Sequence, residues 1–445
     1  MAIGETKRRK HATFSFSLQE RGKNVLLAKE SVNCDCRLGS LKSGMGATPL
    51  RKSDGSTHTC PEGNVTHIVI RKDLDDETKT YTERIGALTD EGAFFLQSAL
   101  DGEFTQITVN VFAPGIVQFA GTDSRYKLAV IGETMCAFLR EDDSFDLAMM
   151  DGMSRIGCFF AHRMFIGVKP STLTCSAPEN VQSFNPSIND GGLIRFPNAG
   201  GMMVAMQVYE ERLYLFFEYG ILRVDAKGAV KDFKAEQLPY TGGKIYGKSV
   251  CAGVRGIYFL ASDGVYHFDG KWTKRVLDGF VLCPKGETLL ESSAAFAGRV
   301  FLRYETDEGY KTLVFYEGEE SGYYTDFFPI FNKDDGGKCL FTEPDRKIYE
   351  FSERGEKGAD GSFSSEETDL GTGVRKTLTN LYFTGRGSFT LTVKTGGRKL
   401  VRELTFQEGR AEVRLSESGE RFSFDFALPY GSEVSSMSAA YLPFA

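Results

Sequence analysis

The sequence predicts an all-β fold: a six- or seven-bladed β-propeller followed by a small C-terminal β-sandwich. Three observations favour this class. Glycine (49) and phenylalanine (36) are abundant while proline is modest (13), as expected for many strands joined by turns. Short apolar runs alternate with polar turns, and one strand-turn-strand pattern recurs along the chain. The length of 445 residues allows more than one domain.

The repeat is clearest in the strings "LYLFFEYGILRVD" and "IYFLASDGVYHFD", which begin 44 positions apart. Gly220 corresponds to Gly264, and Asp225 corresponds to Asp269. Upstream of each string lies a further pair of apolar runs around a short polar turn, as in "AMQVYEERLYLF" and "SVCAGVRGIYFL". Each unit therefore reads as a set of antiparallel strands that cannot bury its own apolar faces.

Looser copies lie on both sides, and their strands begin at about 93, 128, 164, 213, 257, 300 and 339. These intervals are typical of propeller blades, so residues 61–355 are assigned to the propeller. Residues 356–372 are rich in Gly, Ser and acidic residues and predict a linker. Residues 373–445 hold about six alternating strands and predict the β-sandwich.

The first 60 residues leave two interpretations open. "ATFSFSLQ" and "NVLLAKESV" look like strands, and a loop rich in Gly, Ser and Lys follows them. An N-terminal strand could complete the last blade and close the ring. Alternatively, residues 1–60 could form an extended arm that holds a neighbouring subunit.

Composition limits the function classes. A net charge of −7 argues against a protein that binds nucleic acid over its whole surface. The nine cysteines lie mostly in apolar runs, which predicts reduced, buried thiols and synthesis in a reducing compartment. The basic N-terminus is not followed by an apolar segment, so we expect neither a signal peptide nor a membrane-spanning segment.

Asp263 in "ASDGVY" could be a catalytic carboxylate or a sugar ligand. The preceding unit has Glu-Tyr-Gly at the same place, which favours a turn residue before a glycine. We therefore assign turn and structural roles to five residues: Gly220, Asp225, Asp263, Gly264 and Asp269.

Cys34, Cys36, His58 and Cys60 could in principle bind zinc. A Cys-x-Cys spacing is tighter than structural zinc sites use, so a chance cluster of thiols is the better interpretation. The sequence predicts no metal site and no cofactor. No nucleophile, metalloprotease, P-loop or dinucleotide motif appears, and we expect no catalytic residues and no enzymatic activity.

The basic run Lys7, Arg8, Arg9 and Lys10 has two readings. It could be a solvated terminus, which is the more common case. It could also contact DNA phosphates or a partner protein, because Lys and Arg tails make sequence-independent phosphate contacts.

Residues 154–276 carry a family resemblance. "HRMFIGVKPSTLTCSAPENVQSFNPS", "GGLIRFPNAGGMMVAMQVYEERLYLFFEYGILRVD" and "GKSVCAGVRGIYFLASDGVYHFDGKWTKRV" resemble the β-propeller structural proteins of tailed bacteriophages. These are proteins of the tail-hub, neck and packaged-DNA-stabilisation type. The resemblance implies a non-enzymatic virion component that assembles in a ring around the DNA path. The N-terminal half matches poorly.

The same resemblance implies the surroundings of the protein. Expected partners are a portal or adaptor ring, the tail tube, tail fibres and further copies of the chain, with DNA as a further candidate. The expected location is the virion tail or neck, after assembly in the cytoplasm of the bacterial host.

Two other classes stay open. One is a glycan-binding or glycan-cleaving propeller, a lectin or glycosidase used to recognise a host surface. The other is a cellular scaffold of the WD40 or kelch kind, which the missing Gly-His, Trp-Asp and Gly-Gly signatures disfavour.

Overall fold

The computed structural model describes residues 9–17, 25–36, 39–44, 46–74, 78–99, 101–107, 111, 115–118, 126–150, 152–185, 190–277, 293–306, 309–319, 322–325, 330–333, 338–343, 345–352 and 355–444. Contacts divide the chain into two compact units. The propeller unit comprises Pro49–Thr312 and Phe328–Glu350. The terminal unit comprises Met1–Thr48, Leu313–Phe327 and Phe351–Ala445.

Five four-stranded antiparallel sheets follow one another along the chain, each with its strands in sequence order, and we number them blades 1 to 5. Blade 1 has β6 (Val65–Leu74), β7 (Tyr81–Thr89), β8 (Phe94–Gln97) and β9 (Phe104–Ile107). Blade 2 has β10 (Gly115–Gln118), β11 (Tyr126–Ile131), β12 (Met135–Arg140) and β13 (Phe145–Met149). Blade 3 has β14 (Met153–Phe160), β15 (Arg163–Val168), β16 (Thr172–Cys175) and β17 (Gly192–Arg195). Blade 4 has β18 (Met203–Tyr209), β19 (Arg212–Phe217), β20 (Gly220–Asp225) and β21 (Lys234–Leu238). Blade 5 has β22 (Cys251–Ala252), β23 (Ile257–Ala261), β24 (Gly264–Phe268) and β25 (Thr273–Val276).

The sixth four-stranded sheet closes the ring, and we call it the closing blade. It joins β30 (Ile330–Lys333), β31 (Cys339–Thr342) and β32 (Ile348–Ser352) to the N-terminal strand β5 (Gly46–Pro49). Between blade 5 and the closing blade, four more strands pair in chain order. They are β26 (Ala294–Phe296), β27 (Arg299–Thr306), β28 (Gly309–Tyr316) and β29 (Gly322–Thr325).

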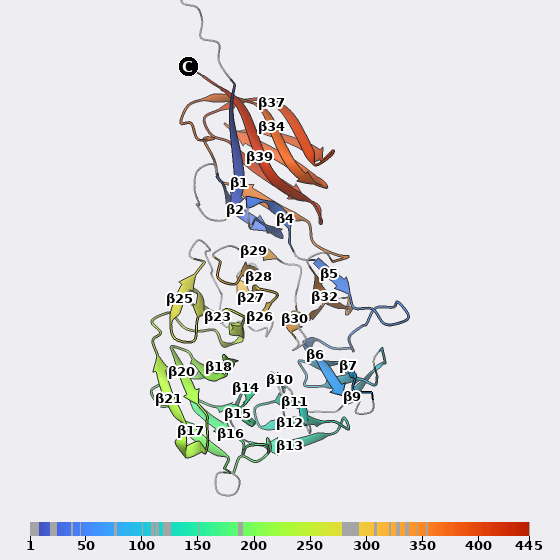
Figure 1. Cartoon of the computed structure of the whole chain (residues 1–445), viewed down its shortest axis with the longest axis vertical. Helices are drawn as coiled ribbons and strands as arrows, with labels where there is room; N and C mark the ends of the chain where they lie inside the picture. Colours follow the sequence, from blue (N-terminus) through green and yellow to red (C-terminus); the bar gives the residue numbers. More distant parts are fainter. Residues whose placement is uncertain are drawn as a thin grey trace, which may run out of the picture. The chain divides into compact units, whose positions relative to one another are not determined.

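The first strands of these groups contact one another in sequence around a ring. Contacts run from β10 to β14, β18, β22, β26 and β30, and β30 in turn contacts β6 (Figure 1). Six separate four-stranded sheets, with the additional group β26–β29, thus form an all-β propeller. The predicted six- or seven-bladed propeller is confirmed.

Blade faces are apolar on both sides because each blade is covered by its neighbours. All five residues of β23 are buried, and so are five of the six in β19. The side chains of these two strands meet between blades 4 and 5, where Phe216 packs edge-on against Phe259 at 5.5 Å between ring centroids. Tyr214 packs in the same way against Phe268 at 5.1 Å. Such pairs contribute about 0.5–1.5 kcal/mol beyond their area burial.

The segment after β5 ties the closing blade to blade 1. The N–H of Leu50 donates to the Ile348 carbonyl at 2.9 Å, and the N–H of Ile348 donates to the His58 carbonyl at 2.9 Å. The buried His58 ring turns toward blade 1 instead, where its Nδ1 lies 2.8 Å from the Gln97 Nε2. The strand β5 thus completes the last blade, and the reading of residues 1–60 as an arm that holds a neighbouring subunit stays a prediction.

The hydrogen bonds of His58 define its tautomer. Gln97 Oε1 accepts the Ile85 N–H at 3.1 Å, so the Gln97 amide nitrogen donates to His58 Nδ1. The proton of the neutral ring then sits on Nε2, which is 3.3 Å from Asp101 Oδ1. Burial lowers the pKa of His58, and Lys52 acts in the same direction, whereas Asp101 opposes them. A proton on Nδ1 would face the Gln97 donor.

Blades 1 and 2 are held together by a partly buried charge network around the buried Arg71. The Arg71 side chain, 2% exposed, donates to Asp73 Oδ1 at 2.7 Å, to the Glu141 carbonyl at 2.7 Å and to Asp143. Arg84 bridges the same carboxylates, at 3.0 Å from Asp73 Oδ2 and 2.8 Å from Asp143 Oδ2. Burial tends to raise the pKa of Asp143, but Arg84 and Arg71 outweigh it and hold that pKa below its usual range.

The terminal unit contains two hydrogen-bonded groups of strands. The N-terminal strands are β1 (Lys10–Ser17), β2 (Val25–Val32), β3 (Cys34–Asp35) and β4 (Leu41–Ser43). The C-terminal strands are β33 (Gly361–Ser365), β34 (Lys376–Arg386), β35 (Ser388–Thr395), β36 (Arg398–Thr405), β37 (Arg410–Gly419), β38 (Ser423–Leu428) and β39 (Glu433–Pro443). One group joins β37, β34, β39, β1 and β4, and the other joins β36, β35, β38, β33 and β2. The two groups are connected, because β1 also pairs in parallel with β2.

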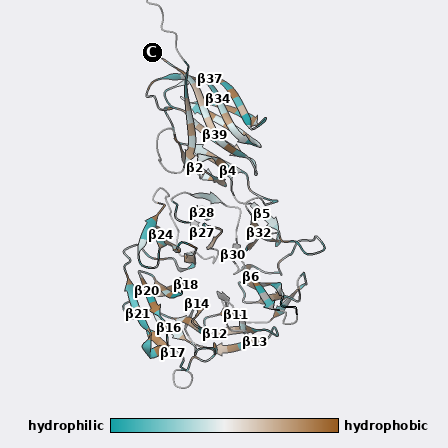
Figure 2. Cartoon of the chain, viewed as in Figure 1, coloured by the Kyte–Doolittle hydropathy of each residue, from teal (hydrophilic) through white to brown (hydrophobic). Residues whose placement is uncertain are grey.

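One apolar core serves both groups. Phe16 of β1 packs edge-on against Phe363 of β33 at 5.6 Å and against Phe426 of β38 at 5.3 Å. The N-terminal strand β1 pairs antiparallel with the C-terminal strand β39, from Lys10–Tyr441 to Phe14–Met437. Figure 2 shows apolar positions interspersed with polar ones along these strands.

Two boundaries in the structure differ from the sequence-based division. Residues 1–60, treated as one segment, are divided between β1–β4 of the terminal unit and the strand β5 of the closing blade. Residues 356–372, treated as a linker, include β33, which pairs with β2 and β38. "GSFSS" has a single bulky residue, Phe363, and its burial depends on strands distant in sequence.

The lowered pKa of His58 predicts that the free energy of unfolding depends on pH. Because its folded-state pKa is lowered, the unfolded chain binds more protons between the lowered and the ordinary pKa. The stabilisation is fully present above the ordinary histidine pKa and is lost as pH falls through it toward the lowered value. Urea unfolding at several pH values between about 8 and 5 measures this slope. His58→Gln should flatten it, whereas the exposed control His162→Asn should not; equal slopes in all three proteins would contradict the assignment.

The charge network predicts a large effect of a small change. Asp143→Asn keeps the side-chain shape and tolerates the positive φ of 66° at this position, but leaves Arg71 short of a counter-charge. We expect a loss of about 2–3 kcal/mol in the free energy of unfolding. Glu91→Gln, in the exposed turn between β7 and β8 of blade 1, should change the free energy of unfolding by less than about 0.5 kcal/mol. Chemical denaturation checks both, and equal losses would refute the role of Asp143.

Candidate functional site

The candidate site is the pair of turns in blade 5 that the sequence singled out. Ser262-Asp263 joins β23 to β24, and Asp269–Trp272 joins β24 to β25. The two turns lie at opposite ends of β24, so they belong to opposite ends of the blade. Asp263 and Asp269 therefore do not come together as a carboxylate pair.

Asp263 connects its turn to the segment that leads into blade 5. Its Oδ1 accepts the N–H of Gly243 at 2.8 Å, and its Oδ2 accepts the hydroxyl of Tyr266 at 2.7 Å. Ser262 adds a third link, since its Oγ accepts the N–H of Lys244 at 3.0 Å. Both carboxylate oxygens thus hold protein groups, which is how a carboxylate organises a turn.

Gly220 and Gly264, the two glycines of the repeat, are required for different structural reasons. Gly264 has a φ of 149°, a conformation that other residues rarely adopt. At Gly220 an added Cβ would lie 2.3 Å from the carbonyl oxygen of Ala199, so a side chain there would displace the backbone of a neighbouring loop.

Asp269 organises the second turn from within. Its Oδ1 accepts the backbone N–H groups of Lys271 at 2.8 Å and Trp272 at 2.7 Å. Burial tends to raise the pKa of Asp269, but the N–H donors of Trp272 and Lys271 outweigh it and hold the pKa below its usual range. Asp225, its counterpart in blade 4, is exposed at the end of β20 and pairs across the sheet with Lys234.

The Asp269 turn presents the single tryptophan of the chain to solvent. Trp272 is 65% exposed, and Val254, at the other hairpin turn at the same end of blade 5, is also exposed. Blade 4 has two exposed apolar side chains at its opposite end, Met202 and Tyr219. The backbone between them is tied, since the N–H of Tyr219 donates to the Gly200 carbonyl at 2.8 Å. A large apolar side chain on a well-anchored turn can bind a partner surface or the face of a sugar ring.

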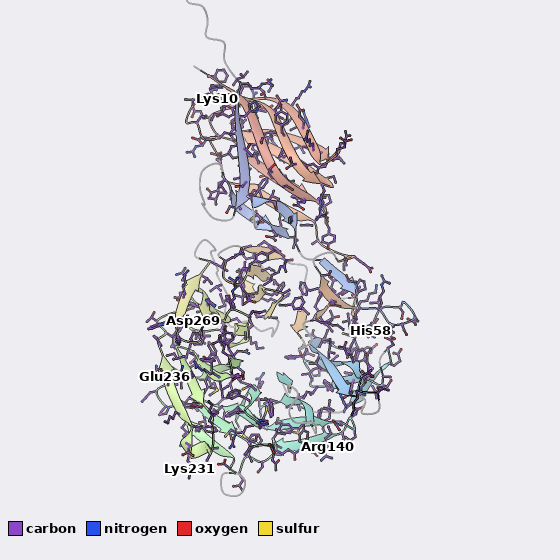
Figure 3. All side chains as sticks on the ribbon, viewed as in Figure 1. Lys10, His58, Arg140, Lys231, Glu236 and Asp269 are labelled. Carbon is purple, nitrogen blue, oxygen red and sulfur yellow. The ribbon has the colours of Figure 1, made fainter. Side chains whose placement is uncertain are left out.

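The basic run is only partly visible. Arg9 and Lys10 are described and exposed, and Lys10 begins strand β1 (Figure 3). Lys7 and Arg8 lie outside the described residues. The interpretations as a solvated terminus and as a DNA or partner contact both stay predictions.

The structure shows how the buried thiols and His58 are surrounded, and the absence of a metal site stays a prediction. Within the described part of the chain, no group of three or more His, Cys, Asp or Glu side chains could hold a metal ion. Both His58 nitrogens already face Gln97 and Asp101. Burial raises the pKa of Cys34, with Cys36 and Asp35 adding to the effect, and burial raises that of Cys60 to about 11. These thiols are protonated, apolar groups at neutral pH.

Sequence reasoning missed the polar clamps between blades. Arg163 is buried and donates to the Ser176 carbonyl at 2.8 Å, to Asp190 Oδ2 at 2.7 Å and to the Gly228 carbonyl at 3.0 Å. It thereby joins blade 3 to the loop that leads into β21 of blade 4. A signal was present, because "AHRMF", "EERLY" and "AGRVF" repeat an arginine at the start of the second blade strand.

Comparisons with known proteins found structural similarities at low sequence identity. No protein-family model matches the chain, and no curated protein matches it. Among solved structures, U3-55K is 12% identical over 69% of this chain and 98% of its own, with a TM-score of 0.44. The β-propeller domain of Cps50 (Swd1) from Myceliophteria thermophila is 11% identical over 66% and 98%, with a TM-score of 0.43. BamB from Moraxella catarrhalis is 11% identical over 73% and 97%, with a TM-score of 0.42. Identities and scores this low say nothing about activity or partners.

The described residues contain no helix that is long and apolar enough to cross a membrane.

Asp269 predicts a local, acid-sensitive stabilisation. Asp269→Ala leaves two turn N–H groups without their acceptor, and we expect a loss of about 1–2 kcal/mol in unfolding free energy. Because the folded-state pKa is lowered, this contribution is present above the ordinary Asp pKa and is lost as pH falls through the lowered one.

Asp225→Ala is the matched control in the preceding unit, and it should cost less than about 0.5 kcal/mol. Denaturation at neutral and acidic pH distinguishes the two residues. Equal losses, or a loss at Asp269 that does not depend on pH, would show that the carboxylate does not organise the turn.

Proposed function

We propose that this protein is a non-enzymatic structural component of a tailed-bacteriophage virion, a tail hub, neck or tail-tip propeller. The observation that carries the proposal is the resemblance of the sequence of residues 154–276 to β-propeller structural proteins of tailed bacteriophages. That stretch coincides with three consecutive blades, from β14 to β25. The resemblance therefore covers whole architectural units rather than fragments of them.

Such a protein would work by shape. Blades that bury aromatic side chains against each other and are clamped by Arg71 and Arg163 form a stiff support for their turns. Exposed apolar side chains on these turns, such as Trp272 and Tyr219, are the kind of residue that anchors protein–protein contacts.

The proposed partners are the portal or adaptor ring, the tail tube, tail fibres and further copies of the chain in a ring around the DNA path. Arg9 and Lys10 are exposed and could add phosphate contacts if DNA passes nearby. The proposed location is the virion tail or neck, after assembly in the cytoplasm of the bacterial host.

Imaging of particles tests this proposal. In purified virions that carry a tagged copy of the chain, electron microscopy with a tag-specific label should place it at the tail or neck. Particles lacking the protein should have an incomplete tail or neck. A tagged protein that is absent from purified particles, with assembly unaffected by its loss, would overturn the proposal.

A Trp272→Ala exchange tests the contact surface separately. We expect at least about a tenfold loss of incorporation into particles, since exposed aromatic anchors dominate interfaces. The exposed control Val401→Ala, in β36 of the terminal unit, should incorporate normally. The melting temperature of both variants should match that of the unchanged protein.

One observation favours a second candidate, a glycan-binding propeller used for host-surface recognition. The exposed ring of Trp272 could stack on a sugar face. A glycan array with the purified protein tests this, and Trp272→Ala should abolish any signal found. The glycan-cleaving version would need a carboxylate pair, and Asp263 with Asp269 does not supply one.

A further inference from the structure

Blade 2 ends in an outer strand, β13, whose edge is suited to pairing with another strand. The N–H of Met150 donates to the Thr134 carbonyl at 3.0 Å, and the N–H of Arg140 donates to the Ser144 carbonyl at 2.9 Å. The register between β12 and β13 is unbroken, so hydrogen-bonded residues alternate along it. The backbone groups of Phe145, Leu147 and Met149 therefore point away from β12. Within the described part of the chain, no strand pairs with that outer edge.

The side chains of the same three residues are apolar and face one side of the blade. Phe145 packs against Phe94 of blade 1 at 6.1 Å between ring centroids, while Leu147 is 58% exposed and Met149 is 73% exposed. In Figure 2, β13 is drawn largely in brown, whereas β21 of blade 4 is largely teal. Leucine and methionine at such exposure on an open strand edge favour association.

The other outer strands are protected. The edge of blade 4 carries Lys234 and Glu236, and that of blade 5 carries Lys274 and Arg275. The residues of β17 in blade 3 whose backbone faces outward are Leu193, 54% exposed, and the charged, exposed Arg195, and β9 in blade 1 has the exposed Gln106. Charged or polar residues on an edge prevent further strand pairing. Among the described outer strands, β13 has the most exposed apolar side chains. None of the three β13 residues whose backbone faces outward, Phe145, Leu147 and Met149, is charged.

Strand addition to an outer strand already occurs in this fold. The outer strand β29 of the group β26–β29 pairs in parallel with β2 at Val32 and Tyr324. The outer strand β5 of the closing blade exchanges two backbone hydrogen bonds with Lys357, at 2.7 and 3.0 Å from Ala47. The edge of β13 offers the same kind of backbone groups.

We propose that β13 pairs antiparallel with the β13 strand of a second copy of this chain, about a two-fold axis at Leu147. In this register Leu147 faces Leu147 of the second copy, and Phe145 faces the second copy's Met149. The register is self-complementary, as a two-fold interface requires. The two blades would form one continuous eight-stranded sheet.

Charges do not oppose this pairing. The charged residue within β13 is Asp146, which would face Ala148 of the second copy rather than another carboxylate. Asp146 is already held in its own blade by the Tyr126 hydroxyl at 2.7 Å and by Arg140 Nε at 2.6 Å. In the dimer, residues next to Asp146 would therefore meet a carboxylate whose charge Arg140 already balances. This inference concerns the protein in solution and does not depend on the proposed virion role.

Analytical ultracentrifugation of the full chain tests the proposal, over about 1–300 µM, the range suited to a small interface. The unchanged protein should form dimers as concentration rises. Leu147→Lys should weaken dimerisation by at least about tenfold, because it places two ammonium groups at the axis. Met149→Lys should act similarly. Because Met149 is highly exposed, this exchange should not disturb folding. Val401→Lys, at an exposed apolar position 45% accessible on β36, is the matched control and should dimerise normally.

Disulfide trapping tests the register. Residues that face each other in a hydrogen-bonded antiparallel pair lie about 5.5 Å apart at Cα, within the reach of a disulfide. Under mild oxidation Leu147→Cys should give a covalent dimer, and Val401→Cys should not. A protein that stays monomeric over the whole range overturns the proposal. So does an oligomer that persists unchanged in Leu147→Lys, or a Leu147→Cys variant that does not crosslink.

Discussion

The structure depends on closure of the propeller ring. A blade whose two faces are apolar is stable only between two neighbours, and a linear series of such blades would leave one face bare at each end. The chain avoids this by returning its N-terminal strand β5 to the last blade. Immediately afterwards, the His58 carbonyl accepts the N–H of Ile348 of that blade, while its ring accepts a hydrogen bond from the Gln97 amide of the first blade. The seam is thus held by backbone pairing and by one buried, neutral imidazole.

Elsewhere the blades are held by aromatic packing with a few buried charges at their boundaries. Phe216 and Phe259 show the first mode, and Arg71 with Asp73 and Asp143 shows the second. A buried arginine is costly to desolvate, but here its donors meet carboxylates and carbonyls on two blades. The arginine hydrogen bonds specify which blade surfaces meet, whereas the aromatic contacts supply most of the apolar burial. A ring held in this way leaves its turns and outer strands available for partners.

The functional conclusion rests on surfaces rather than on a reaction centre. Asp263 and Asp269 use their oxygens to hold turns, and Trp272 projects from one of those turns. The stretch on which the proposed virion role rests covers blades 3 to 5, the part of the molecule that carries these turns. The apolar edge of β13 lies outside that stretch and adds a separate means of association.

The sequence by itself determined the fold class and the turn chemistry, since both follow from local patterns. A period near 44 residues, alternating apolar positions and Asp-Gly turns are readable without knowledge of distant contacts. Tertiary structure alone decided where the N-terminal strands go. β1 pairs with β39 and β5 joins β32, and strand pairing across hundreds of residues leaves no mark in a local pattern. The roles of His58 and Arg163 were likewise decided by neighbours on other blades, because a buried polar side chain is defined by the partners that satisfy it.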